Sequence, residues 1–91
     1  MKVGIIGLGF VGLSFASVLG SKNYSTLGFD SDKKKLSKIK NCNPPFYEPH
    51  LKETLNQAFR KGLKISDDIA TIVKNCQIIF VTVGTPQEND G

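Results

Sequence analysis

The sequence predicts an α/β fold with a doubly wound parallel sheet that is incomplete, with about four strands and flanking helices. Short apolar, β-branched segments alternate with segments of helical periodicity, as in parallel sheets joined by right-handed crossovers. A glycine cluster, GLGFVG, lies between the first such strand and the first such helix. The 91 residues have room for one small domain only, and a polar end follows directly on the fourth expected strand. Because a complete sheet of this kind has six strands, we expect residues 1–91 to be the N-terminal part of a truncated domain.

The first half of the chain is expected to run strand, helix, strand, helix. Residues 2–6 are short, β-branched and nearly all apolar, as in a strand that is covered on both faces. Residues 10–19 have apolar side chains over nearly three turns, and Gly20 is expected to end this buried helix. Residues 25–30 form a second strand that ends in a carboxylate. Ser31 is the expected N-cap of the lysine-rich helix that follows.

The second half begins with a loop that interrupts this alternation. Residues 41–49 include three prolines and two asparagines, which predict an ordered loop. Apolar residues recur on one side of a helix over 51–59. A brief strand at 63–65 is followed by a short helix with Ser66 as its expected N-cap. Residues 77–83, QIIFVTV, are the strongest candidate for a central strand.

The composition is that of a soluble globular chain, with 40% hydrophobic and 22% charged residues. The net charge of +4 comes largely from residues 33–40, where no aromatic residue interleaves the lysines, so we expect no nucleic-acid binding. Cys42 and Cys76 lack metal-binding spacing and His50 is the single histidine, so no metal site is expected. Two reduced thiols indicate a cytosolic protein. No apolar run approaches the ~20 residues of a membrane span, and no signal peptide is expected.

Gly7, Gly9 and Gly12 form a GxGxxG motif directly after a buried strand and at the start of an apolar helix. This context is typical of a turn that binds the diphosphate of a dinucleotide. The first glycine permits a tight turn, the second lets the diphosphate approach the backbone, and the third allows the helix to pack close to the strand. The N–H groups and the dipole at the helix start then attract the negative charge. The alternative is a tight strand-to-helix turn that binds no ligand.

Asp30 lies 18 residues after Gly12, at the end of the second expected strand. At this spacing a carboxylate accepts hydrogen bonds from the adenosine ribose, and it would repel the 2′-phosphate of NADP, so NAD is the expected cofactor. Lysines just beyond could partly offset that repulsion, and a helix-capping carboxylate is the alternative without a ligand. Gly84 and Thr85 follow the fourth expected strand and should face the same crevice, where Gly84 admits the cofactor and Thr85 hydrogen-bonds to it. The alternative for this loop is a Gly-Pro strand terminator.

The whole chain resembles the N-terminal NAD-binding domain of the UDP-glucose/GDP-mannose dehydrogenase family, which has a Rossmann fold. KVGIIGLGFVGLSFA is similar to the family's opening, and FDSDKKKL to its acid followed five positions later by a basic residue. PPFYEPHL resembles the family's YEPGL segment, and VTVGTPQENDG its VGTP loop. The YEPHL segment is the most discriminating, because generic Rossmann dehydrogenases lack it. His50 departs from the family, which usually has glycine there.

The resemblance implies roles for particular residues. The glycine turn, with Phe10 and Val11, would hold the diphosphate, and Asp30 would bind the adenosine ribose. Lys35 would reach back to the same ribose, and Thr85 would lie beside the cofactor.

The resemblance also implies an activity. Family members oxidise the C6 alcohol of a nucleotide sugar to a carboxylate with two NAD, by way of a cysteine thiolate that captures the aldehyde. That cysteine and its helpers lie beyond this chain, and neither Cys42 nor Cys76 matches it. The resemblance is strongest to the UDP-glucose 6-dehydrogenases of polysaccharide biosynthesis, which implies a cytoplasmic, homo-oligomeric parent with a separate substrate-binding domain. Residues 1–91 would then bind NAD and contain no catalytic residue. The alternatives are a non-catalytic nucleotide-sensing Rossmann module and another NAD-dependent dehydrogenase, acting on a hydroxy acid.

Overall fold

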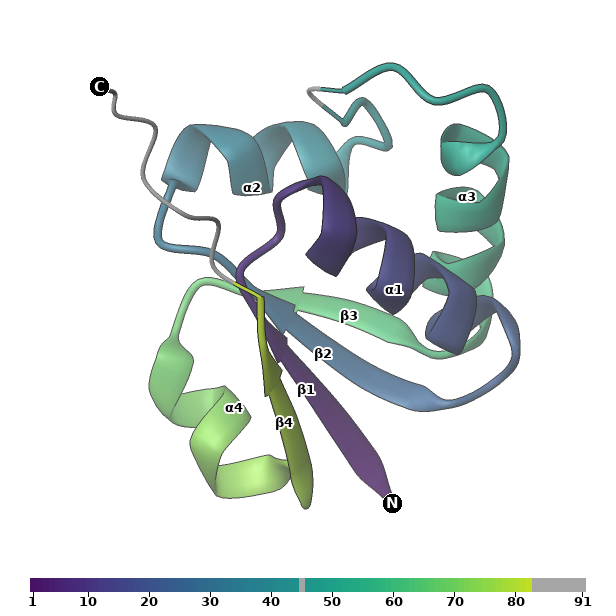
Figure 1. Ribbon diagram of the computed structural model, residues 1–91. Helices are drawn as coiled ribbons and strands as arrows, with labels where there is room; N and C mark the ends of the chain where they lie inside the picture. Colours follow the sequence, from purple (N-terminus) through teal and green to yellow (C-terminus); the bar gives the residue numbers. More distant parts are fainter. Residues whose placement is uncertain (45, 83–91) are drawn as a thin grey trace.

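The computed structural model describes residues 1–44 and 46–82, in which strands and helices alternate as predicted (Figure 1). Gly84 and Thr85 lie outside the described residues. The elements in chain order are β1 (Lys2–Ile6), α1 (Phe10–Ser21), β2 (Ser25–Phe29), α2 (Lys33–Lys40), α3 (Leu51–Lys61), β3 (Leu63–Ser66), α4 (Ile69–Asn75) and β4 (Ile78–Val81).

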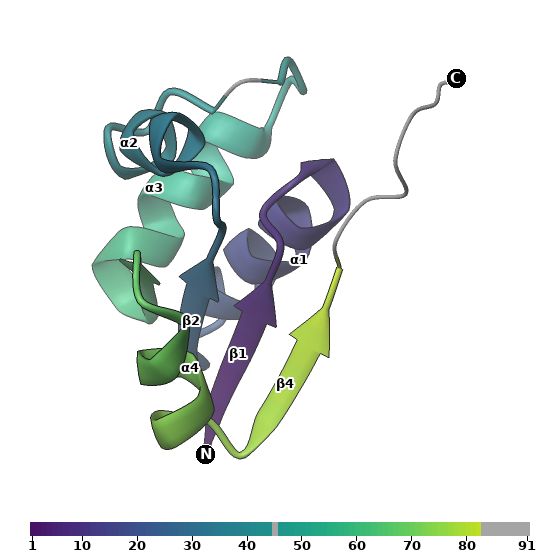
Figure 2. The ribbon, with the colours of Figure 1, turned by 90° about the vertical axis from the view of Figure 1, so that its left-hand side faces the viewer.

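All the strand pairs are parallel, in the order β3-β2-β1-β4, which confirms the predicted fold class. In the register of the sheet, Ile5 of β1 lies opposite Gly28 of β2 and Phe80 of β4. Because β1 lies between β2 and β4 and runs parallel to both, the carboxyl ends of these three strands lie along one edge of the sheet (Figure 2). The glycine turn and Asp30 follow two of these strand ends.

β4 forms where the apolar run predicted a strand. In the described part of the chain it pairs with β1 alone and lies at the edge of the sheet, with Phe80 41% and Val81 64% exposed. It is also shorter than expected, covering Ile78–Val81. An apolar run indicates that both faces of a strand can be buried, but it does not indicate how many strands lie beside it.

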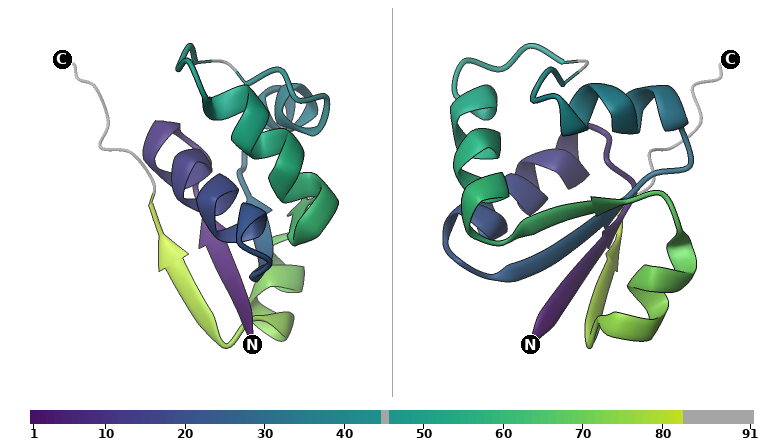
Figure 3. Two further views of the ribbon diagram at one scale, coloured as in Figure 1. Left: turned by 90° about the vertical axis from the view of Figure 1, so that its right-hand side faces the viewer. Right: turned by 180° about the vertical axis from the view of Figure 1, so that it is seen from behind.

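The helices cover both faces of the sheet. α1 and α3 pack against each other on one face, and α4 contacts β1, β2 and β3 from the other (Figure 3). The predicted one-sided helix is confirmed in α3, which buries Leu51, Leu55 and Ala58. Each fully buried Leu or Ile side chain of this core stabilises the fold by about 1.5–3 kcal/mol relative to an exposed one. No helix among the residues described is long and apolar enough to span a membrane.

Gly20 does not end α1, contrary to the sequence prediction. It lies inside the helix, where an added Cβ would come within 2.8 Å of Leu63 Cβ and 2.9 Å of Ala58 Cβ. Its lack of a side chain lets α1 approach α3 and β3 closely. Asn23 closes the helix instead with a φ of 71°, a conformation that asparagine tolerates better than most residues. The N–H groups of Asn23 and Tyr24 each donate to a carbonyl oxygen of the last turn at 3.0 Å.

Two predicted N-caps are also displaced by one or two residues. Asp32, and not Ser31, caps α2, and its carboxylate accepts from two backbone N–H groups of the first turn at 3.0 and 3.2 Å. Asp68, and not Ser66, caps α4, while the Ser66 hydroxyl accepts from the Asp68 N–H at 3.0 Å. Serine and aspartate are almost equally good N-caps, so the sequence alone does not choose between close neighbours of these two types.

Candidate cofactor-binding site

Gly7 makes the turn that leaves β1. Its φ of 100° lies in the left-handed region that glycine adopts readily and other residues avoid. Its N–H still donates to the Phe29 carbonyl at 2.8 Å, so the chain turns immediately after its last sheet hydrogen bond. The tight-turn role predicted for this glycine is therefore present in the structure.

Gly12 lies where α1 comes closest to the end of the sheet. An added Cβ would overlap the Gly7 carbonyl oxygen and Thr82 Oγ1. Neither atom can move away freely, because one belongs to the backbone and the other is hydrogen-bonded to it. The close approach of helix to strand, predicted for the third glycine of the motif, is present.

Gly9 is not explained by packing among the residues that the structure describes. Its φ of −67° and ψ of −168° are accessible to any residue, and an added Cβ would meet no atom of the described chain within 4 Å. The space above this residue is open, at the start of a helix. A ligand that must approach the backbone closely would account for the missing side chain, and so the cradle fits a dinucleotide diphosphate.

The start of α1 carries an uncompensated partial positive charge. The first intrahelical hydrogen bond runs from the Leu13 N–H to the Gly9 carbonyl at 2.9 Å, which leaves the N–H groups of Phe10, Val11 and Gly12 without a partner inside the helix. In the described part of the chain no side chain caps this end, and the first turn contains no acidic residue. Free N–H groups at an uncapped helix start are suited to an anion. The Phe10 and Val11 side chains are exposed and carry no hydrogen-bond donor, so hydrogen bonds to a diphosphate would come from their backbone.

Asp30 follows β2 and is tied directly to the glycine turn. Its Oδ2 accepts from the Leu8 N–H at 2.8 Å and from Lys35 Nζ at 3.2 Å. Its Oδ1 accepts from the Asp32 N–H at 2.9 Å. A carboxylate oxygen can accept two hydrogen bonds, so Oδ1 has room for one more donor, such as a ribose hydroxyl.

The surroundings of Asp30 keep its carboxyl ionised. Burial acts to raise its pKa, but hydrogen bonds from the N–H groups of Asp32 and Leu8, with the nearby Lys35 ammonium, outweigh burial and lower the pKa overall. Asp30 is therefore an acceptor at neutral pH, as binding to ribose hydroxyls requires. The resemblance placed Lys35 in the ribose region, and the structure places its ammonium beside Asp30.

The structure gives Cys42 and Cys76 no features of a reactive nucleophile. Both are half-buried, and burial raises the pKa of each thiol, so both are protonated at neutral pH. Cys42 donates to Asn56 Oδ1 at 3.3 Å, and Cys76 follows α4. The residues described contain no group of three or more His, Cys, Asp or Glu that could hold a metal ion.

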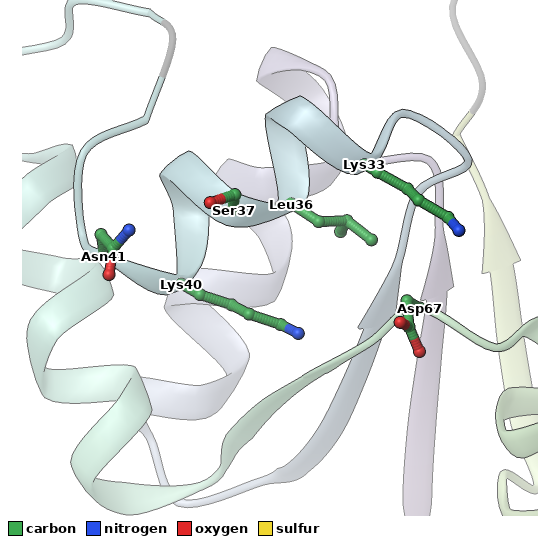
Figure 4. A pocket seen from close by; sticks show the side chains of 6 residues that line it. All are labelled: Lys33, Leu36, Ser37, Lys40, Asn41 and Asp67. Carbon is green, nitrogen blue, oxygen red and sulfur yellow. The ribbon is translucent and has the colours of Figure 1, made fainter.

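The hollow beside α2 is separate from the glycine turn. It has a volume of about 260 Å³, and Figure 4 shows the Lys33 and Lys40 ammonium groups directed toward the side that carries Asp67. Neither the glycine turn nor Asp30 lines it. The lining residues are Lys33, Leu36, Ser37, Lys40, Asn41 and Asp67.

Sequence reasoning missed the role of Thr82. Its hydroxyl donates to the Gly7 carbonyl at 2.6 Å, across 75 positions of sequence. The available signal was a polar residue at the end of an apolar strand, which also fits an ordinary strand end.

A parallel sheet, a glycine turn open toward a free helix start and an ionised acceptor after β2 define a dinucleotide-binding domain of the Rossmann type. The chain belongs to the UDP-glucose/GDP-mannose dehydrogenase family, whose NAD binding domain matches residues 1–91. The cofactor of this domain is NAD.

Relatives with both kinds of sugar specificity match the whole chain. A putative UDP-glucose 6-dehydrogenase of Bacillus subtilis, YtcA, is 34% identical over 91 residues, and a GDP-mannose 6-dehydrogenase of Pseudomonas syringae pv. tomato is 32% identical over 92. In each case 100% of this chain matches 21% of the relative. This chain therefore spans about a fifth of the length of these relatives.

Solved structures agree with this assignment. A UDP-glucose dehydrogenase from Pyrobaculum islandicum superposes with a TM-score of 0.89 at 27% identity, over 98% of this chain and 21% of that chain. A GDP-mannose dehydrogenase from Pseudomonas aeruginosa gives 0.89 at 30% identity, over 100% and 21%. A malate dehydrogenase from Cryptosporidium parvum gives 0.65 at 19% identity, over 99% and 26%, which reports on the fold alone.

Proposed function

We propose that this chain is the NAD-binding part of a nucleotide-sugar 6-dehydrogenase that oxidises the C6 alcohol of UDP-glucose, or of a related nucleotide sugar, to the carboxylate. The observation that carries the proposal is the open space above Gly9, beside the backbone N–H groups that begin α1. A glycine that neither the turn nor the packing of residues 1–44 and 46–82 requires is best explained by a ligand that approaches the backbone closely. The family supplies the class of reaction.

The proposal gives each site residue a task. The N–H groups of Phe10, Val11 and Gly12 bind the diphosphate, and Asp30 Oδ1 accepts from the adenosine ribose. The Lys35 ammonium lies 3.2 Å from Asp30 Oδ2 and, together with the N–H groups of Asp32 and Leu8, lowers the pKa of this carboxyl. Gly84 and Thr85 lie outside the described residues, so their contact with the cofactor stays a prediction from the sequence.

NAD, when bound, would accept the hydride that is removed from the substrate. Converting an alcohol to a carboxylate removes four electrons, equivalent to two hydrides, and adds one oxygen from water. One product therefore requires two NAD, and this chain binds each of them in turn. Cys42 and Cys76 are protonated thiols that serve the packing, so the proposal places the catalytic residues in the rest of a longer protein.

UDP-glucose is proposed as the substrate on the strength of the relatives. Those called UDP-glucose 6-dehydrogenases are 34–35% identical to this chain, and those called GDP-mannose 6-dehydrogenases 32%. The margin is small, and the sugar would be bound by other parts of the protein. The experiment must therefore offer several nucleotide sugars.

Turnover by the longer protein tests the proposed function. With NAD and UDP-glucose we expect two NADH for each sugar consumed, measured by absorbance, and slower turnover with GDP-mannose. The 91-residue chain alone is expected to give no NADH with either sugar. Absence of NADH formation from the longer protein with every nucleotide sugar offered would contradict the proposed activity.

Replacing Asp30 by alanine tests the basis of cofactor choice. The variant loses the ribose acceptor and the partner of Lys35, so we expect NAD affinity to fall about tenfold and the preference for NAD over NADP to narrow. Calorimetric titrations with both dinucleotides measure the two effects. Asp67→Ala removes an exposed carboxylate after β3 and is the matched control. Unchanged NAD affinity in the Asp30 variant would remove this residue from the site.

A further inference from the structure

The residue that follows β4 is joined to the glycine turn by two hydrogen bonds. The Thr82 N–H donates to the Ile6 carbonyl at 2.8 Å, continuing the sheet, and the Thr82 hydroxyl donates to the Gly7 carbonyl at 2.6 Å. The side chain is half-buried, so the bond is partly shielded from water. Thr82 thus connects the end of β4 to the carbonyl of the residue that makes the turn.

The peptide group between Gly7 and Leu8 is hydrogen-bonded at both its C=O and its N–H. The Leu8 N–H, which belongs to the Gly7–Leu8 peptide, donates to Asp30 Oδ2 at 2.8 Å. In a trans peptide the C=O and the N–H point in opposite directions. One rigid plane is therefore fixed between Thr82 after β4 and Asp30 after β2, on the two sides of β1 (Figure 2).

The orientation of this plane decides how the chain enters α1. Gly7 has a φ of 100°. Because glycine can adopt several other backbone conformations almost as easily, the residue type alone does not fix the orientation of the next peptide. Gly12 lies directly against the Thr82–Gly7 hydrogen bond, because an added Cβ there would overlap both of the bonded oxygens. A rotation of the peptide would therefore also displace the first turn of the helix.

We propose that Thr82 is a positioning residue: its hydroxyl fixes the Gly7–Leu8 peptide so that the free N–H groups at the start of α1 face the diphosphate. This inference rests on the proposed NAD binding. Asp30 has a double task in this arrangement, because it accepts from the ribose and also anchors the second end of the peptide.

Two variants that differ by one hydroxyl group isolate the effect. Thr82→Ala removes the donor without adding bulk beside the Gly7 carbonyl, and Thr82→Ser retains the donor. We expect Thr82→Ala to weaken the binding of NAD and of ADP, which both contain the diphosphate, by about tenfold. Binding of adenosine, which lacks the diphosphate, is expected to change less than about twofold, because Asp30 remains in place. Thr82→Ser should restore ADP affinity to within about twofold of the original chain.

The titrations separate a positioning role of Thr82 from general damage to the site and from a failure of cofactor binding. Circular dichroism and urea unfolding first establish that the variants fold, and if the alanine variant does not, the serine variant is compared with Thr82→Cys, whose thiol is a weaker donor. Equal ADP affinity with and without the hydroxyl overturns the positioning role. An equal loss for adenosine and ADP also overturns it, since it would indicate general damage to the site. Failure of the original chain to bind NAD or ADP would instead overturn the proposed cofactor binding, and the inference with it.

Discussion

Replacing Gly12 by alanine is expected to destabilise the chain by about 3 kcal/mol and to abolish NAD binding. The added methyl group would overlap the Gly7 carbonyl oxygen and Thr82 Oγ1, so helix and strand must separate. The loss should appear although alanine is a better helix former than glycine by up to about 1 kcal/mol. Urea unfolding measures the stability, and calorimetry with NAD measures the binding.

A matched control exists in the same turn. Gly9→Ala adds the same methyl group three residues earlier, where the described chain offers open space. We expect this variant to lose about 1 kcal/mol of stability, the cost of replacing glycine at the N-cap, which is well below the loss in the Gly12 variant. A Gly12 variant as stable as the Gly9 variant would show that α1 can shift without cost, contrary to the close packing described above.

Gly9→Ala is itself expected to lower NAD affinity about 100-fold while the fold is retained. Its backbone conformation suits alanine, and loss of glycine at a helix N-cap costs only about 1 kcal/mol. The methyl group would occupy the space that the diphosphate needs to reach the N–H groups of Phe10, Val11 and Gly12. Losing about two charge-assisted hydrogen bonds accounts for a change of this size. Urea unfolding and calorimetry on the same sample should therefore show a small change in stability and a large loss of NAD affinity.

The parts of the site that could be predicted depend on local chemistry. The roles of Gly7 and Gly12 follow from a strand, a turn and a helix that are contiguous in sequence, and the structure contains both. The position of Asp30 beside the turn follows from parallel strands that end along one edge of the sheet. These features need only the strand order and the spacing of residues.

The parts that could not be predicted depend on tertiary contacts or on near-equal local preferences. The hydrogen bond of Thr82 joins residues 75 positions apart and depends on the exact placement of β4 beside β1. Gly20 has the residue type of a helix terminator, but it lies inside α1, where an added Cβ would come within 2.8 Å of Leu63 Cβ. Asn23 then ends the helix, because asparagine is the second choice for the left-handed position after glycine.

The central claim is that NAD lies with its diphosphate on the backbone at Gly9, and paired calorimetric titrations of the original chain and Gly9→Ala test it most directly. The predicted result is that the original chain binds NAD, and that the variant loses about 1 kcal/mol of stability or less, remains folded, and binds NAD about 100-fold more weakly. Equal NAD affinity for the two folded proteins would contradict the claim.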